Sequence, residues 1–99
     1  MNELTPEQIR AGRGLLGWSQ RELAEKSVVH LKTVARLEID GDEKHAVSRI
    51  KVQRQLEAGG VVFIPEDERL GPGVRLAKGV VSERVATAQS KSSKPSLNK

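Results

Sequence analysis

Residues 19–41 limit what this chain can fold into more than any other stretch, because they carry the signals of two short helices with a tight connection between them. Ser19 is a favoured N-cap residue, and Glu22 follows three positions later. The hydroxyl and the carboxylate of such a pair each accept a hydrogen bond from a backbone N–H group at the start of a helix. A helix is therefore predicted to begin at Gln20.

A second helix is predicted to begin after His30 and to stop at Gly41, because glycine readily takes the left-handed conformation that ends helices. Isolated helices shorter than about 12 to 15 residues are marginal in water, so neither segment is expected to be stable alone. Two helices joined by a turn of about three or four residues form a helix-turn-helix, and the stretch favours this arrangement.

The second helix is expected to have two chemically different faces. At about 100° per residue, Leu31, Val34 and Leu37 lie within one arc. Lys32 and Arg36 lie side by side on nearly the opposite arc. One face should therefore pack against the rest of the protein, and the other should present two cations.

An earlier helix is predicted over residues 6–16. Thr5 serves as its N-cap, a proline follows at its first position, and Gln8 completes a second capping box. Gly12 and Gly14 lie inside this helix, where each costs about 1 kcal/mol relative to alanine. They are either tolerated weak points or places where another helix approaches closely.

The rest of the chain predicts one more helix, a hairpin and a tail. The helix is expected over residues 47–58, before a pair of glycines. A β-branched and aromatic run over 61–64 and an alternating run over 73–78 predict two strands of a β-hairpin. An isolated hairpin is only marginally stable, so it must pack on the helices or pair with another chain. The Ser- and Lys-rich segment 79–99 is expected to be disordered, either as a solubilising tail or as a nonspecific attraction for phosphates.

The net charge of the chain, +4, says little about its folded part. Residues 79–99 hold four basic residues and one acid, so they carry +3 and leave +1 for residues 1–78.

The chain has no cysteine, which excludes disulfides and thiolate metal sites and is consistent with a reducing compartment. No apolar run approaches the roughly 20 residues that span a bilayer, and no signal-peptide pattern is present, so a cytoplasmic protein without membrane association is expected.

Enzymatic chemistry finds little support in the sequence. With two histidines and neither Cys nor Tyr, no nucleophile is placed beside a base, so we expect no catalytic residue and no cofactor. His45, close to Asp42 and Glu43, could be drawn as a metal site. No further ligand lies nearby, so a solvated loop is the expected interpretation and no metal is expected.

Residues 19–41 resemble the DNA-binding motif of the Cro/repressor (Xre) family of bacterial and phage transcriptional regulators. Gln20 matches the residue that opens the first motif helix, and Ala24 stands where a small residue lets the two helices cross closely. The apolar positions of the motif are filled by Val29, Val34 and Leu37. Val28 stands where the family has glycine, and a β-branched residue at positive φ is strained. We therefore expect an altered turn or a helix cap shifted by one residue.

The resemblance extends from about residue 4 to residue 78 and implies a mostly α fold. This fold is a small lambda-repressor-like helix-turn-helix bundle of about four helices, with a C-terminal β-hairpin and a disordered basic tail. Residues 1–60 would form the DNA-binding domain, residues 61–78 the hairpin and residues 79–99 the tail. The hairpin is a candidate dimerisation element, or it simply caps the bundle.

The resemblance also implies roles for individual residues. Lys32 and Arg36 would lie in the major groove, where an arginine can donate two hydrogen bonds to guanine. Leu31 would contact a thymine methyl group or belong to the core. Three further residues would lie at the DNA backbone or at the edge of the site: Gln20, His30 and Thr33.

Arg13 and Glu38 match a family pair in which an arginine of the first helix binds a glutamate near the end of the recognition helix. Glu38 also falls on the inward arc, where an unpaired carboxylate is costly. A structural ion pair is therefore expected here rather than a contact with DNA.

Together these expectations describe a sequence-specific regulator of transcription that binds double-stranded DNA. It would most simply be a repressor that occupies promoter DNA as a homodimer. The alternative is an antitoxin or a protein-interaction adaptor built on the same fold, with a toxin or another protein as partner. A nonspecific nucleic-acid binder is disfavoured because only one Trp and one Phe are available to stack on bases.

Overall fold

The computed structural model describes residues 4–40 and 43–80 of the chain. Within these residues there are four α-helices, one 3₁₀ helix and a two-stranded antiparallel sheet. Their order is α1 (Pro6–Leu16), α2 (Gln20–Ser27), α3 (Leu31–Leu37), η1 (Glu43–His45), α4 (Ala46–Gly59), β1 (Val61–Ile64) and β2 (Gly73–Leu76). The prediction of a small, mostly helical bundle followed by a β-hairpin is confirmed.

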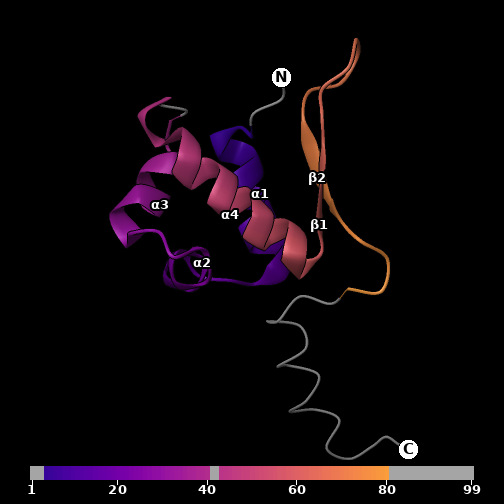
Figure 1. Cartoon of the computed structure of the whole chain (residues 1–99). Coiled ribbons are helices and arrows are strands. Elements are labelled where there is room, and N and C mark those ends of the chain that lie inside the picture. The colour runs from indigo at the N-terminus through magenta and orange to yellow at the C-terminus, as the bar shows by residue number, and fades with distance from the viewer. Residues whose placement is uncertain (1–3, 41–42, 81–99) are drawn as a thin grey trace, which may run out of the picture.

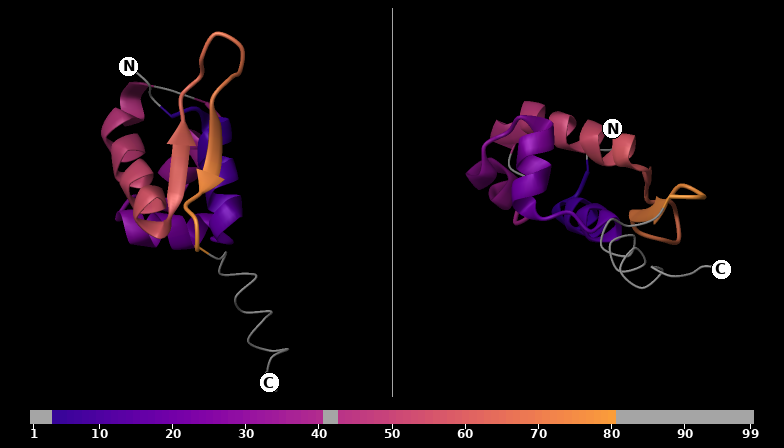
Figure 2. Two further views of the ribbon diagram at one scale, coloured as in Figure 1. Left: turned by 90° about the vertical axis from the view of Figure 1, so that its right-hand side faces the viewer. Right: turned by 90° about the horizontal axis from the view of Figure 1, so that it is seen from below.

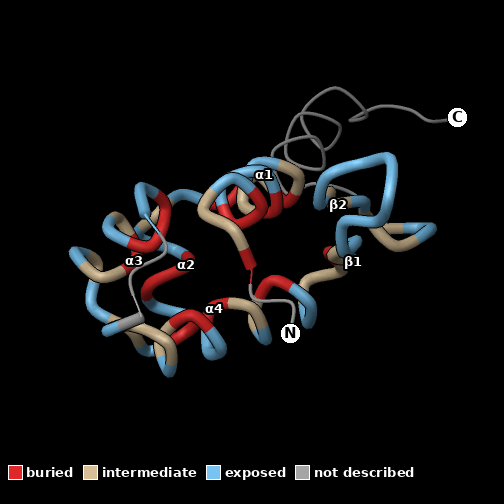
Figure 3. Tube along the Cα trace, turned by 90° about the horizontal axis from the view of Figure 1, so that it is seen from above, coloured by how far each residue is buried: buried red, intermediate tan, exposed pale blue. Residues whose placement is uncertain are grey.

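The helices form a bundle that carries the hairpin on one side. In Figure 1, α3 lies at one end of the molecule and the hairpin at the opposite end, with α1 and α4 between them. The view from above in Figure 3 shows the same separation, and Figure 2 shows the hairpin in front of α1 and α4 when it is viewed face-on. Helix α1 packs against both strands, whereas α4 packs against β1, α2 and α3.

The core lies where the helices and the first strand meet, as the inward-facing buried segments in Figure 3 show. Its fully or almost fully buried apolar side chains are Leu4, Ile9, Leu16, Trp18, Leu23, Ala24, Val34, Leu37, Val52, Leu56 and Val61. No helix in the described part of the chain is both long enough and apolar enough to cross a membrane.

Helix α1 begins and ends as its sequence predicts. The Gln8 N–H donates to Thr5 Oγ1 at 3.0 Å, and the Thr5 N–H donates to Gln8 Oε1 at 3.0 Å, so the capping box is complete. Gly17 ends the helix in the left-handed conformation, with φ 75°.

The side chain of Gln8 also anchors the hairpin. Gln8 is buried, and its Nε2 donates to the backbone carbonyl of Gly73 at 3.0 Å and to that of Ile64 at 3.4 Å. A buried amide is costly unless its hydrogen bonds are made, so this side chain holds the hairpin to the start of α1. Packing on the helices, one of the two alternatives for the hairpin, is therefore what the structure shows.

The inner face of the hairpin completes the core. The register pairs Val61 with Leu76 and Phe63 with Val74, and all four side chains pack against the buried cluster. A Cβ atom on Gly12 would lie 3.4 Å from Val61 Cγ1 and 3.5 Å from the Phe63 ring. The close approach at this glycine is therefore made by the hairpin and not by another helix.

The tip of the hairpin is held by a carboxylate. Asp67 Oδ1 accepts hydrogen bonds from the N–H groups of Leu70 at 2.7 Å and Arg69 at 2.8 Å. These bonds, that from Leu70 first, lower the pKa of Asp67 below its usual value. Their contribution to stability is present above the usual aspartate pKa and is lost as the pH falls through the lowered value.

Outside the segment of α2 and α3, the structure departs from the sequence prediction at residues 43–45 and at Val80. Residues 43–45 form the 3₁₀ helix η1 rather than an irregular loop, and His45 is half-buried with its Nδ1 out of contact with solvent. Val80 was assigned to the disordered tail but packs against the core, beside the backbone of Gly60. The rest of the predicted tail, 81–99, and the predicted helix stop at Gly41 lie outside the described residues.

Two glycines in helices should respond in opposite directions to alanine. At Gly14 of α1 a Cβ atom would meet nothing within 4 Å, whereas at Gly59 of α4 it would lie 2.8 Å from Leu16 Cδ1 and 2.9 Å from the Trp18 ring. We expect Gly14→Ala to raise the free energy of unfolding by about 1 kcal/mol, through helix propensity. We expect Gly59→Ala to lower it by about 1 to 3 kcal/mol, through overpacking. Urea denaturation followed by circular dichroism measures both, and a stabilised Gly59→Ala would contradict the described packing.

Candidate nucleic-acid interface

Helix α2 is positioned by its capping box. The Glu22 N–H donates to Ser19 Oγ at 3.0 Å, and the Ser19 N–H donates to Glu22 Oε1 at 2.7 Å. The helix begins at Gln20, as predicted, and buries Leu23 and Ala24. Its start and its inward face are therefore set by the N-cap residue Ser19 and by residues of the helix itself.

Helix α3 begins at Leu31, as predicted, and is capped by a histidine ring. His30 Nδ1 accepts a hydrogen bond from the Lys32 N–H at 3.2 Å, so the ring proton of the neutral imidazole lies on Nε2. Val34 and Leu37 are buried, with 0% and 1% of their surfaces exposed. The helix is thus seated by the apolar arc that the sequence indicated.

The end of α3 differs from the prediction. The helix stops at Leu37, and Glu38 follows as its C-cap in the right-handed conformation, with φ −83°. Tight turns follow the helix, and in them the N–H groups of Ile39 and Asp40 both donate hydrogen bonds to the backbone carbonyl of Arg36. The helix therefore ends without a left-handed glycine at its C-cap.

The turn between α2 and α3 contains a strained residue. Val28 adopts the left-handed conformation, with φ 56° and ψ 51°, so the turn is neither altered nor shifted by one residue. Its N–H and that of Val29 donate to carbonyls of the last turn of α2. The Val28 side chain is 81% exposed, which keeps the β-branched group out of contact with the helices but does not relieve its backbone.

The Glu38 carboxylate joins three helices. Arg13 Nε donates to Glu38 Oε2 at 2.7 Å, and Arg13 Nη2 donates to Oε1 at 2.9 Å, which makes a bidentate ion pair between α1 and the end of α3. Gln20 Nε2, at the start of α2, donates to the same Oε1 at 3.0 Å. The side chain of Glu38 is 3% exposed, so these hydrogen bonds replace the water that would otherwise solvate the carboxylate.

Two arginines of α1 extend this cluster. Arg13 Nη1 donates to the backbone carbonyl of Trp18 at 3.1 Å, and Arg10 donates to the backbone carbonyl of Glu38. The hydrogen bonds to Glu38 raise the pKa of Arg13 above its usual value, against the smaller opposing effect of burial. Arg13 therefore stays charged throughout the ordinary pH range. The role of Arg10 escaped the sequence analysis, although its position one turn before Arg13 places it on the same face of α1.

The open side of α3 carries the two predicted cations. Lys32 and Arg36 are exposed, and Arg36 Nη1 lies 3.8 Å from Asp40 Oδ2. The side chains of that pair are 58% and 49% exposed, so water screens the interaction and its breakage costs little free energy. Thr33 is half-buried and His30 is exposed at the start of the helix.

Gln20 and Leu31 have divided roles. One N–H of the Gln20 amide is used by Glu38, which leaves the second as the donor for an external ligand. Leu31 is half-buried and packs against the core, yet it also faces an open hollow between α2 and α3. Leu31 is therefore in part a core residue, and its contact with a thymine methyl group stays a prediction.

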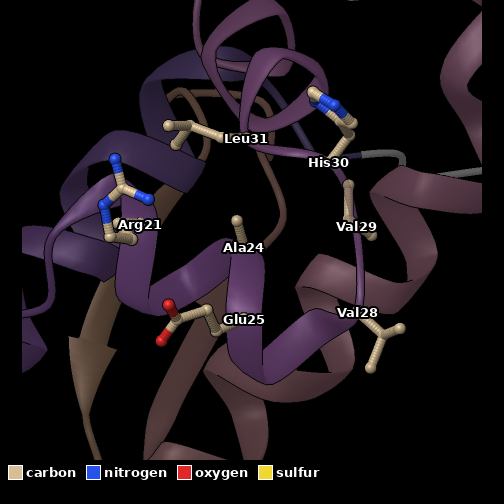
Figure 4. A pocket seen from close by; sticks show the side chains of 7 residues that line it. All are labelled: Arg21, Ala24, Glu25, Val28, Val29, His30 and Leu31. Atoms are coloured by element: carbon tan, nitrogen blue, oxygen red, sulfur yellow. The ribbon is translucent and has the colours of Figure 1, made fainter.

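This hollow has a volume of about 520 Å³ and was not foreseen from the sequence. It is lined by Arg21, Ala24, Glu25, Val28, Val29, His30 and Leu31. Figure 4 shows Arg21 and Leu31 on one side of the hollow and Val28 at the turn on the other. Arg21 therefore adds a third cation on the α2 side of the start of α3.

The fold and this site define a class of protein. Helix α3 follows α2 across a tight turn, packs through its apolar arc and presents cations to solvent. This arrangement is that of a DNA-binding helix-turn-helix.

Residues 9–61 match the sequence model of the family HTH_3, Helix-turn-helix. The chain belongs to this Xre-type helix-turn-helix family and is a DNA-binding regulator of transcription. A comparison with curated proteins found no significant match.

Replacing Val28 should relieve the strain in the turn. Val28→Gly removes a β-branched residue from the left-handed region and loses almost no packing, so we expect the free energy of unfolding to rise by about 1 kcal/mol. Val28→Asn should give a smaller gain, because asparagine tolerates this conformation better than valine. Thermal unfolding of the three proteins measures the order, and a Val28→Gly protein less stable than wild type would contradict the described turn.

The ion pair should be more sensitive to the loss of one partner than to the loss of both. Arg13→Met leaves the Glu38 carboxylate buried without its partner, so we expect it to lower the free energy of unfolding by about 3 kcal/mol. Arg13→Met combined with Glu38→Met should recover much of this loss, because no buried charge remains. Denaturant unfolding completes the double-mutant cycle, and additive effects of the two substitutions would argue against a direct pair.

Proposed function

We propose that the protein is a sequence-specific repressor that occupies promoter DNA as a homodimer on a two-fold operator. The observation that carries the proposal is the polarity of α3, with Val34 and Leu37 buried and Lys32 and Arg36 exposed on the other side. A helix with this polarity can enter the major groove without disturbing the core.

In this proposal Lys32 and Arg36 contact base edges. Arg36 would exchange its weak, solvent-exposed pairing with Asp40 for two hydrogen bonds to guanine O6 and N7. Lys32, one turn earlier, is a compact charge that can meet a guanine or a phosphate. Leu31 lies at the edge of the hollow, where its exposed part can contact a thymine methyl group.

The proposed phosphate contacts use donors that the fold leaves available. The Nδ1 atom of His30 is occupied by the Lys32 N–H, so Nε2–H is its donor for a phosphate. Thr33 adds a hydroxyl, and Gln20 adds the amide N–H that does not reach Glu38. Such contacts set the position of α3 on the duplex and do not read sequence.

The acidic residues after α3 are compatible with this orientation. Glu38 is buried and paired with Arg13, so it presents no negative charge to a phosphate. Asp40 lies beyond Arg36, at the end of α3 opposite to His30. The start of α3 would therefore approach the duplex more closely than its end.

Selection of bound sequences from a random duplex pool tests the function. We expect a palindromic consensus, because a two-fold dimer presents the same helix to two half-sites. A pool that yields no consensus would favour the alternative of an antitoxin or adaptor that binds another protein.

Substitutions test the assigned face. Arg36→Ala should weaken binding to the best site by about 1 to 3 kcal/mol and relax the preference at one base pair. Lys32→Ala should reduce the salt dependence of binding if the lysine meets a phosphate. Arg75→Ala is the matched control, because it removes the same kind of exposed charge from the hairpin, at the opposite end from α3. Fluorescence anisotropy measures all three, and equal affinities of wild type and the double variant Lys32→Ala, Arg36→Ala would exclude this face.

A further inference from the structure

The hairpin has a strand edge that nothing in the described part of the chain covers with another strand. The sheet contains β1 and β2 alone, so each strand has one edge without a strand partner. The Ala77 N–H donates to the carbonyl of Gly60 at 2.7 Å, just beyond the pair Val61 and Leu76. Hydrogen-bonded and non-bonded pairs alternate in antiparallel ladders. The backbone groups of Val61 and Phe63 therefore point away from β2, toward the open edge of β1.

The two edges differ in how they are protected. Strand β2 carries the exposed Arg75, and a charge discourages pairing at an edge. A proline lies directly beside each strand, Pro65 after β1 and Pro72 before β2, so the difference between the edges lies in the charge. Strand β1 has the sequence Val-Val-Phe-Ile, without a charge or a proline. The β1 edge therefore has the composition of a strand that pairs with another chain.

The position of α3 restricts how a second copy can use this edge. Helix α3 and the hairpin lie at opposite ends of the molecule, so the outer face of the sheet points away from α3 (Figures 1 and 2). Two hairpins stacked through their outer faces would direct the two α3 helices away from each other. Two β1 strands paired edge to edge and antiparallel have their two-fold axis perpendicular to the sheet. This arrangement places both helix bundles on the same side of one continuous sheet and directs both α3 helices the same way.

We propose that two copies of this chain form a dimer through antiparallel pairing of their β1 strands, giving a four-stranded sheet in the order β2-β1-β1-β2. The pairing that uses the open groups of both strands sets Val61 opposite Phe63 of the second copy. It places the two Val62 residues next to each other at the two-fold axis. Val62 is 47% exposed in the single chain, and the partly exposed Ile64 lies on the same outer face.

The charges of the hairpin favour the antiparallel direction. The tip carries Glu66, Asp67 and Glu68 with one arginine, whereas Lys78 follows β2 at the other end of the hairpin. Antiparallel pairing brings the acidic tip of one hairpin to the basic end of the other, and parallel pairing would bring like charges together. A two-fold dimer has the antiparallel arrangement by symmetry.

The value of this dimer for reading an operator rests on the proposed function, but its existence can be tested separately. In Val62→Lys and in Val62→Glu, like charges would meet at the two-fold axis, so each variant should dissociate at least about ten times more readily than wild type. Val62→Thr, a β-branched and uncharged substitution, is the matched control and should remain dimeric. Sedimentation equilibrium measures the association, and circular dichroism shows that each variant is folded.

A mixture of the two charged variants gives the decisive measurement. Lys and Glu side chains that meet across the axis attract each other, so the mixture should associate where each variant alone does not. A monomeric wild type, a dimeric Val62→Lys protein or a mixture that stays monomeric would each overturn the proposal. None of these outcomes concerns DNA, whereas a dimer that selects no DNA sequence would contradict the proposed function alone.

Amide hydrogen exchange of the wild-type chain is a second measurement that needs no variant. The N–H groups of Val61 and Phe63 should exchange more slowly as the protein concentration rises, because they become hydrogen-bonded only in the dimer. The N–H group of Arg75, which faces β1 within the hairpin, should change much less. Exchange at Phe63 that is independent of concentration would overturn the proposal.

Discussion

The arrangement of this protein depends on one buried carboxylate. The Glu38 carboxylate, at the end of α3, accepts hydrogen bonds from Arg13 of α1 and Gln20 of α2. The backbone carbonyl of Glu38 accepts one from Arg10 of α1. A carboxylate at 3% exposure is tolerated only when such partners are in place. The cluster therefore ties the end of α3 to α1 and α2. Because Glu38 follows directly on the helix that presents Lys32 and Arg36, the same contacts hold that helix against the bundle.

The hydrogen bonds of the Gln8 side chain hold the hairpin to the bundle, as those of Glu38 hold the helices to one another. The amide of Gln8 completes the cap of α1 with its oxygen and holds the strand ends with its nitrogen. Together with the inner-face side chains, it orients the sheet so that its outer face points away from α3. The α3 face that we propose reads DNA and the β1 edge that we propose pairs with a second copy are thereby separated, so neither contact would obstruct the other.

Two residues of the protein lower the free energy of unfolding, and a larger core would compensate for them more easily. Val28 is held in a left-handed conformation, and Gly14 weakens α1 without making any close contact. The eleven buried apolar residues in the described part of the chain form a small core, which leaves little stability in reserve. The proposed association of two copies would add to the stability of each fold by mass action, so dimer formation and folding would be coupled.

What the sequence by itself determined is what depends on neighbours within about four residues. Both capping boxes, the starts of α1, α2 and α3, the apolar arc of α3 and the two strands follow from local hydrogen bonds and side-chain periodicity. The family resemblance extended this to the pairing of Arg13 with Glu38 and to the bundle as a whole.

Only the tertiary structure decided the contacts between distant residues. Gln8 meets Gly73 across 65 positions, and Arg10 meets Glu38 across 28, which no periodicity encodes. The conformation of Val28 belongs to the same group, because its local preference is against the left-handed region. The packing of α2 and α3 on either side of the turn overrides that preference. Local hydrogen bonds set where α1, α2 and α3 begin, but long-range packing set where the elements meet and which edge of the hairpin stays open.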